Sequence, residues 1–93
     1  MINNNKDKIL KEFMTIPSVG KSVAEDLWEL GYRSIEQLKN EDPEKMYEEH
    51  CHQKGCKVDR CVLYTFRCLV YYVSNDSYDP ELLKWWNWKN YEL

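Results

Sequence analysis

The sequence predicts an all-α domain of five to six short helices that pack around one buried helix at about residues 58–74. A length of 93 residues with 43% hydrophobic content is typical of a single domain with one modest core. The three Gly and three Pro fall at the ends of segments that have helical periodicity. Between residues 61 and 73 only Thr65 and Arg67 are strongly polar, and a helix that is apolar on nearly all sides is buried on nearly all sides. We expect residues 1–93 to form this one domain.

The N-terminal third predicts two helices joined by a tight turn. Apolar residues form a single stripe over about residues 6–14, and Pro17 ends that helix. A turn follows at residues 18–20, and a second helix is expected at about 21–30. Gly31 stands where a left-handed C-cap is expected.

Capping signals mark the next two helices. Ser34 is the expected N-cap of a short third helix, and Gln37 lies three residues later, as in a capping box. Asp42 followed by Pro43 predicts the start of a fourth helix, which we expect to run to about Gln53.

The C-terminal segment, residues 79–93, is rich in aromatic residues. Asp79 and Pro80 predict a last helix, which would close the core by packing Trp85 or Trp86 together with Leu82. We expect Trp88 and Tyr91 to remain exposed. An exposed aromatic pair would stack nucleobases or anchor a protein partner.

The segment Ile16-Pro-Ser-Val-Gly-Lys-Ser-Val-Ala-Glu-Asp-Leu-Trp-Glu-Leu-Gly31 carries the chemistry. Gly20 lets the backbone approach a ligand closely, and the helix that starts there directs free N–H groups and the positive end of its dipole outward. Such a helix start is an anion site. Lys21 adds a charge, Ser22 a hydroxyl, and Val19 would either pin the turn to the core or press on a sugar.

This run resembles the helix-hairpin-helix motif of DNA repair and replication proteins, which belongs to a SAM-like fold. Over residues 13–73, including the stretch 57–68, the chain resembles the small bacterial "pathogenicity locus" family, some of whose members are described as mitomycin-resistance proteins. The resemblance implies sequence-independent contact with DNA phosphates through backbone amides around residues 19–22. It would make the protein a DNA-repair or stress accessory. Where the motif has its first Gly this chain has Ser18, for which a left-handed backbone is strained.

A second basic turn lies before the central helix and contains Lys54, Lys57 and Arg60. It would form a degenerate second hairpin beside the first. The basic turns of the two hairpins would then contact the two strands of a DNA duplex. The alternative is that these residues are ordinary solvated charges at helix ends. The net charge of -3 gives no general attraction to nucleic acid, because residues 22–53 carry nine acidic and three basic residues.

Four Cys and two His suggest a weaker hypothesis, a zinc or thiol-redox module. Cys51, His52, Cys56 and Cys61 would converge around the turn, although their spacing is not that of usual zinc pairs. The other interpretations are small buried hydrophobes or a Cys51–Cys56 disulfide. Cys56 is the expected reactive thiol because of its basic neighbours. We expect His50 to be a half-buried histidine rather than a base.

No catalytic constellation is apparent, so we expect no enzymatic activity and no cofactor. Glu25, Asp26 and Glu29 have the spacing of a solvated helix face. The absence of an export signal predicts a cytoplasmic protein, and the apolar stretch at 62–73 is shorter than the roughly 20 residues that span a membrane. The expected function is DNA or RNA binding. The alternative is a protein-interaction adaptor that uses the hairpin as a scaffold and the aromatic tail as its contact.

Overall fold

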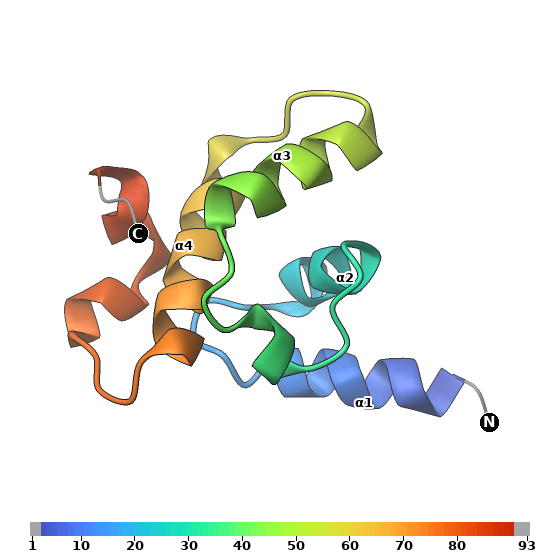
Figure 1. The fold of residues 1–93 in the computed structure, drawn as a ribbon, viewed down its shortest axis with the longest axis horizontal. Helices are drawn as coiled ribbons and strands as arrows, with labels where there is room; N and C mark the ends of the chain where they lie inside the picture. Colours follow the sequence, from blue (N-terminus) through green and yellow to red (C-terminus); the bar gives the residue numbers. More distant parts are fainter. Residues whose placement is uncertain (1–2, 91–93) are drawn as a thin grey trace.

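The computed structural model describes residues 3–90, and every regular element in this range is helical. The fold is all-α, as the sequence predicts (Figure 1). In chain order the elements are α1 (Asn3–Phe13), α2 (Lys21–Glu29), the 3-10 helix η1 (Ile35–Leu38), α3 (Pro43–Lys54), α4 (Arg60–Ser74), and the 3-10 helices η2 (Pro80–Leu83) and η3 (Trp85–Asn90).

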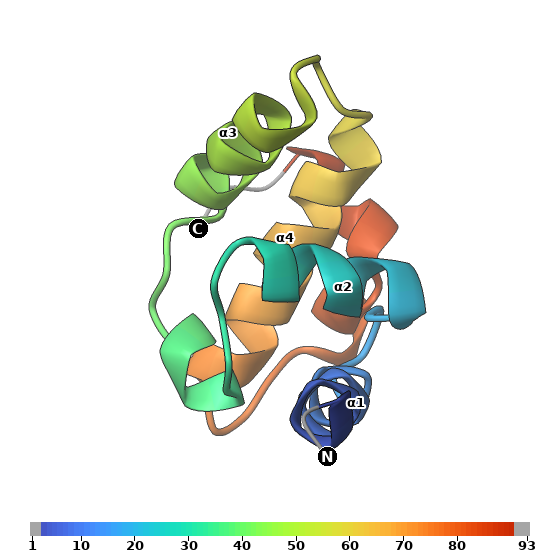
Figure 2. The ribbon, with the colours of Figure 1, turned by 90° about the vertical axis from the view of Figure 1, so that its right-hand side faces the viewer.

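The predicted central helix is α4, which starts two residues later than expected. In Figure 1, η2 and η3 lie on one side of α4, and α2, η1 and α3 lie on the other. Figure 2 shows α2 crossing α4, with α1 below α2. The buried residues of α4 are Leu63, Thr65, Phe66, Arg67, Cys68, Leu69, Val70 and Val73. Thr65 and Arg67, the two strongly polar residues of the apolar run at 61–73, are therefore buried with it.

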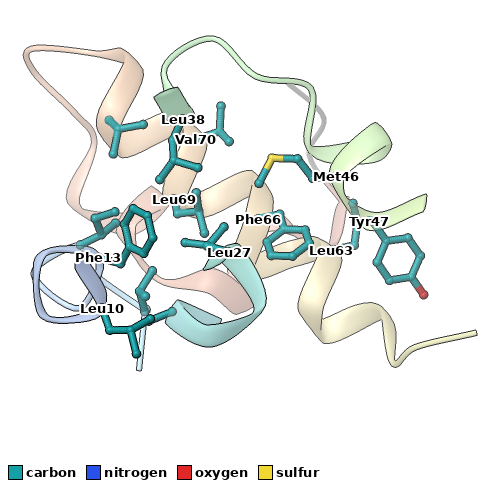
Figure 3. Close-up of a cluster of buried hydrophobic side chains, with 14 residues drawn as sticks. Leu10, Phe13, Leu27, Leu38, Met46, Tyr47, Leu63, Phe66, Leu69 and Val70 are labelled. Atoms are coloured by element: carbon teal, nitrogen blue, oxygen red, sulfur yellow. The ribbon is translucent and has the colours of Figure 1, made fainter. Parts of the chain in front are cut away.

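Helices α1, α2, η1, α3 and α4 contribute apolar side chains to one core, which Figure 3 shows. Phe13 of α1, Leu27 of α2 and Leu38 of η1 are fully buried, and they face Phe66 and Leu69 of α4. Burying a side chain of this size contributes about 1.5–3 kcal/mol each relative to leaving it exposed. The periodicity of these residues is therefore what fixes the four helices around α4.

Side-chain caps define where most helices begin. Ser34, Asp42 and Asp79 accept hydrogen bonds from backbone N–H groups at the starts of η1, α3 and η2, as the sequence predicts. Asp59 caps α4 in the same way by accepting from the Cys61 N–H. Gly31 and Gly55 adopt left-handed backbone conformations where α2 and α3 have ended.

The aromatic tail differs from the single helix expected at 79–93. It forms two 3-10 helices, because the backbone of Lys84 is extended and separates them. The indole of Trp88 donates to the Leu82 carbonyl at 2.7 Å, which folds η3 back on η2.

The expected exposure of the tail aromatics was wrong. Trp88 is 2% exposed, whereas Trp86 is 57% exposed. Trp85 and Leu82 are partly buried, as expected of residues that close the core. Tyr91 lies outside the described residues. Within residues 3–90, no helix is both long and apolar enough to cross a membrane.

Candidate nucleic-acid interface

The turn between α1 and α2, residues 14–20, is held to the core at two points. Ile16 and Val19 are buried, and the Val19 N–H donates to the Ile16 carbonyl at 3.1 Å. The Ile16 N–H in turn donates to the carbonyl of Phe13 at 3.0 Å. Val19 therefore pins the turn to the core, and its amide is already used within the turn.

Ser18 adopts a left-handed backbone conformation, with φ of 73°. This conformation is strained for Ser, as expected from the sequence, because it favours Gly. Its hydroxyl donates to the Leu83 carbonyl at 3.1 Å, and the Cys68 thiol lies 3.7 Å from the hydroxyl oxygen. The side chain thus faces α4 and η2. Of the five residues expected at this site, Ser18 and Val19 are turned inward, so they shape the turn instead of presenting groups to a ligand.

The start of α2 is open to solvent. Gly20 is the N-cap residue, with φ of −97° and ψ of −170°, and no side chain caps the helix. Lys21 and Ser22 are exposed, and no residue in the described range accepts a hydrogen bond from their N–H groups. A Cβ built on Gly20 would meet nothing within 4 Å. The structure therefore brings three of the expected residues, Gly20, Lys21 and Ser22, to one solvent-facing helix end.

Cation–π contacts place positive charge near the C-terminal end of α2. The Arg33 guanidinium lies 3.6 Å from the ring centre of Trp28, and the Lys6 ammonium lies 5.7 Å from the same ring. Arg33 also donates to the carbonyls of Trp28 and Tyr32 at 2.8 and 2.9 Å. The sequence analysis did not identify this cluster, because its members come from α1, α2 and the loop after α2.

The second basic turn does not lie beside the first. Lys54 pairs with Glu29 at 3.4 Å, at the end of α2 opposite Lys21. Eight residues of helix separate Lys21 from Glu29, which is about 12 Å along the axis. Figure 1 shows the turn at 55–59 and the turn before α2 near different ends of α4.

The start of α4 differs chemically from the start of α2. The carboxylate of Asp59 already occupies the helix end by accepting from the Cys61 N–H at 2.9 Å, and this bond lowers the pKa of Asp59. Lys57 and Arg60 line an open groove between α3 and α4. They are exposed charges, and the expected pairing of two phosphate-binding hairpins is not formed.

The cysteines do not form a metal centre in the described part of the chain. No group of three or more potential ligands among these residues is placed to hold a metal ion, so Cys51, His52, Cys56 and Cys61 do not converge as the zinc hypothesis requires. Cys56 and Cys61 are exposed. A hydrogen bond with Asp59 raises the pKa of Cys61 and so disfavours its thiolate.

Cys51 and Cys68 are structural residues. Cys51 is half-buried and accepts from the Val58 N–H at 3.4 Å. Cys68 is buried on α4, and burial raises the pKa of its thiol. These two cysteines match the expectation of small apolar side chains.

Asp26 departs from the expected solvated face of α2. Its carboxylate lies 3.7 Å from Nε2 of His50, whose side chain is 3% exposed. Burial raises the pKa of Asp26, while the neighbouring His50 and Lys54 act in the opposite direction. Nδ1 of His50 is buried without a hydrogen-bond partner among the described residues. The pair joins α2 to α3 and lies away from the open start of α2, so it serves packing.

Comparison with known proteins places this structure in a family. No curated protein and no solved structure matches the chain significantly. The family described as "Pathogenicity locus" matches residues 6–92, which is nearly the whole chain and includes both the open start of α2 and the aromatic tail. The chain belongs to the Pathogenicity locus family.

Proposed function

We propose that the protein binds nucleic acid without sequence preference, and that the open start of α2 holds a backbone phosphate. The observation that carries the proposal is the missing cap. Ser34, Asp42, Asp59 and Asp79 cap other helices of the described chain, whereas Gly20 leaves the N–H groups of α2 free. An uncapped helix start with free N–H groups attracts anions through those groups and the helix dipole.

The side chains at this helix end fit a phosphate. Lys21 supplies a positive charge, Ser22 supplies a hydroxyl donor, and no acidic residue lies in the first turn. Gly20 leaves open space where a side chain would stand, so a phosphate oxygen can reach the backbone. Phosphates repeat along any strand, so contacts of this kind carry no sequence information.

The resemblance of residues 16–31 to the helix-hairpin-helix motif supports the same proposal. In this chain the motif's first Gly is replaced by Ser18, which still adopts a positive φ. A positive φ is a conformation that Gly adopts readily, which supports the resemblance at this position, and the Leu83 carbonyl stabilises the conformation through the Ser18 hydroxyl.

The charge distribution predicts modest affinity. With a net charge of -3, the protein as a whole repels nucleic acid, so only the local site attracts it. Each phosphate neutralised contributes about −0.9 to the slope of log affinity against log salt for duplex DNA. One or two contacts predict a slope of roughly −1 to −2, which is shallow for a DNA-binding protein.

Two substitutions test the proposal directly. Gly20→Asp gives α2 the kind of cap that α3 and α4 have, in a backbone conformation that suits an N-cap and in open space. We expect it to stabilise the fold by a few tenths of a kcal/mol while it abolishes binding, because the carboxylate takes the N–H groups and repels phosphate. Lys21→Glu is expected to abolish binding as well.

The control is Lys45→Glu, which changes net charge by the same amount as Lys21→Glu on the exposed surface of α3. Binding of a fluorescent duplex and of a single strand is measured by anisotropy at several salt concentrations, and stability by thermal unfolding. Equal losses from Lys45→Glu and Lys21→Glu would mean that net charge alone is responsible. Wild-type protein that binds neither probe at low salt would refute the proposal and favour the adaptor function, with exposed Trp86 as the contact.

A further inference from the structure

The aromatic tail forms a groove, which we call the C-terminal groove, walled by Leu82, Trp86, Asn87, Lys89 and Asn90. Its volume is about 370 Å³, within the size range of pockets that hold small ligands, about 300–1,000 Å³. Trp86 is 57% exposed, whereas Trp88 of the same 3-10 helix is 2% exposed. The open indole of Trp86 forms one wall of the groove, so its face is available to a ligand.

The groove is rigidly attached to the proposed phosphate site. Ser18 binds the Leu83 carbonyl, and Trp88 and Cys68 bind the Leu82 carbonyl at 2.7 and 3.5 Å. Lys21 lies three positions after Ser18, and Trp86 lies three positions after Leu83. Three positions span at most about 10 Å, so the two places lie within about 30 Å of each other, a distance that one short nucleic-acid segment can cover.

The chemistry of the groove fits a nucleobase. The indole of Trp86 offers a stacking face, with the ring of Trp85 behind it at 5.8 Å in an edge-to-face arrangement. The amide of Asn90 offers both a donor and an acceptor, and the ammonium of Lys89 can meet an adjacent phosphate.

The two carboxylates at the rim are engaged within the tail. Asp79 accepts from the Glu81 N–H at 2.9 Å, and Glu81 pairs with Lys84 at 3.2 Å. Their negative charge is therefore partly compensated where a nucleotide would enter. The negative charge that remains on Asp79 and Glu81 repels a run of several phosphates along the groove. The groove therefore fits a single nucleobase, either at the end of a strand or next to a duplex.

We propose that the C-terminal groove binds an unpaired nucleobase of the same nucleic acid whose phosphate is held at the start of α2. This inference rests on the proposed function and gives its substrate class: duplex with an adjoining single-stranded segment. Base–aromatic stacking is available only when the base has left the duplex, so the groove selects such junctions over continuous duplex.

The test compares a blunt DNA duplex with the same duplex carrying a short single-stranded extension. We expect wild-type protein to bind the extended duplex about tenfold more tightly, which is the effect of one stacked base. Trp86→Ala is expected to remove this preference and to leave binding of the blunt duplex unchanged. Trp86→Phe is expected to retain most of the preference, because it keeps an aromatic face.

Tryptophan fluorescence gives an independent readout. Stacking on the exposed Trp86 quenches emission when the extension binds, and we expect this quench to be absent in Trp86→Phe. A preference that survives Trp86→Ala, or equal loss on both duplexes, would overturn the inference while leaving the phosphate site intact. Failure of the phosphate site is recognised separately, because Gly20→Asp would then not weaken binding of the blunt duplex.

Discussion

A single buried arginine holds the tail to the central helix, and removing it gives the sharpest stability prediction. Arg67 is 4% exposed. Its guanidinium donates to one carboxylate oxygen of Glu44 at 3.1 and 2.7 Å and to the Trp88 carbonyl at 2.8 Å. One side chain of α4 thereby joins α3 to η3.

Arg67→Met keeps most of the apolar volume but removes every donor. The Trp88 carbonyl loses a hydrogen bond from a charged donor in a buried position, which costs about 1.5–3 kcal/mol. Glu44 is 49% exposed and turns to water, so the lost ion pair adds only about 1 kcal/mol. The expected loss of unfolding free energy is about 2–4 kcal/mol. At roughly 4–8 °C per kcal/mol for a domain of this size, Tm falls by about 8–32 °C.

Urea unfolding followed by tryptophan fluorescence measures this loss. Glu44→Gln is the matched control, because its amide oxygen still accepts from the guanidinium, and we expect it to cost under about 1 kcal/mol. An Arg67→Met protein within about 0.5 kcal/mol of wild type would show that the tail is held by apolar packing alone.

Three further predictions concern the turn before α2, the stability of the fold at high pH, and the reactivity of the cysteine thiols. Ser18→Gly should be more stable than Ser18→Ala by about 1–2 kcal/mol in urea unfolding, because both lose the bond to Leu83 but only Gly relieves the positive φ. Burial and a hydrogen bond to Glu41 raise the pKa of Tyr32 above its ordinary 10.0. As pH rises past that value, Tyr32 loses its proton in the unfolded chain but keeps it in the folded protein, so the free energy of unfolding falls. Tyr32→Phe should reduce that slope in urea titrations at increasing pH; an unchanged slope would contradict the assignment. Mass spectrometry after brief alkylation should find Cys68 unmodified until unfolding and Cys61 slow for an exposed thiol.

Local signals in the sequence predict the helices well. Ser34, Asp42 and Asp79 each start a helical segment, and the apolar run at 61–73 lies within the central helix. These signals act over a few residues, so they can be recognised without knowing what the segment packs against.

Features that depend on distant residues were not predictable in the same way. From the sequence we expected Trp88 to be exposed, but the tail forms 3-10 helices and Arg67 binds the Trp88 carbonyl, so Trp88 is buried and Trp86 is not. At the candidate site, the outward direction of Lys21 follows from the helix start, whereas the inward direction of Ser18 depends on Leu83.

The bond between Ser18 and Leu83 spans 65 positions of sequence and has a consequence for the order of folding. Helices α3 and α4 adjoin in sequence and can associate through short-range contacts, whereas closing a loop of this length has a higher entropic cost. We expect the tail to dock late, after α4 has formed. Until then the turn before α2 lacks the partner that supports its left-handed residue, so this turn and η2 reach their final shape together.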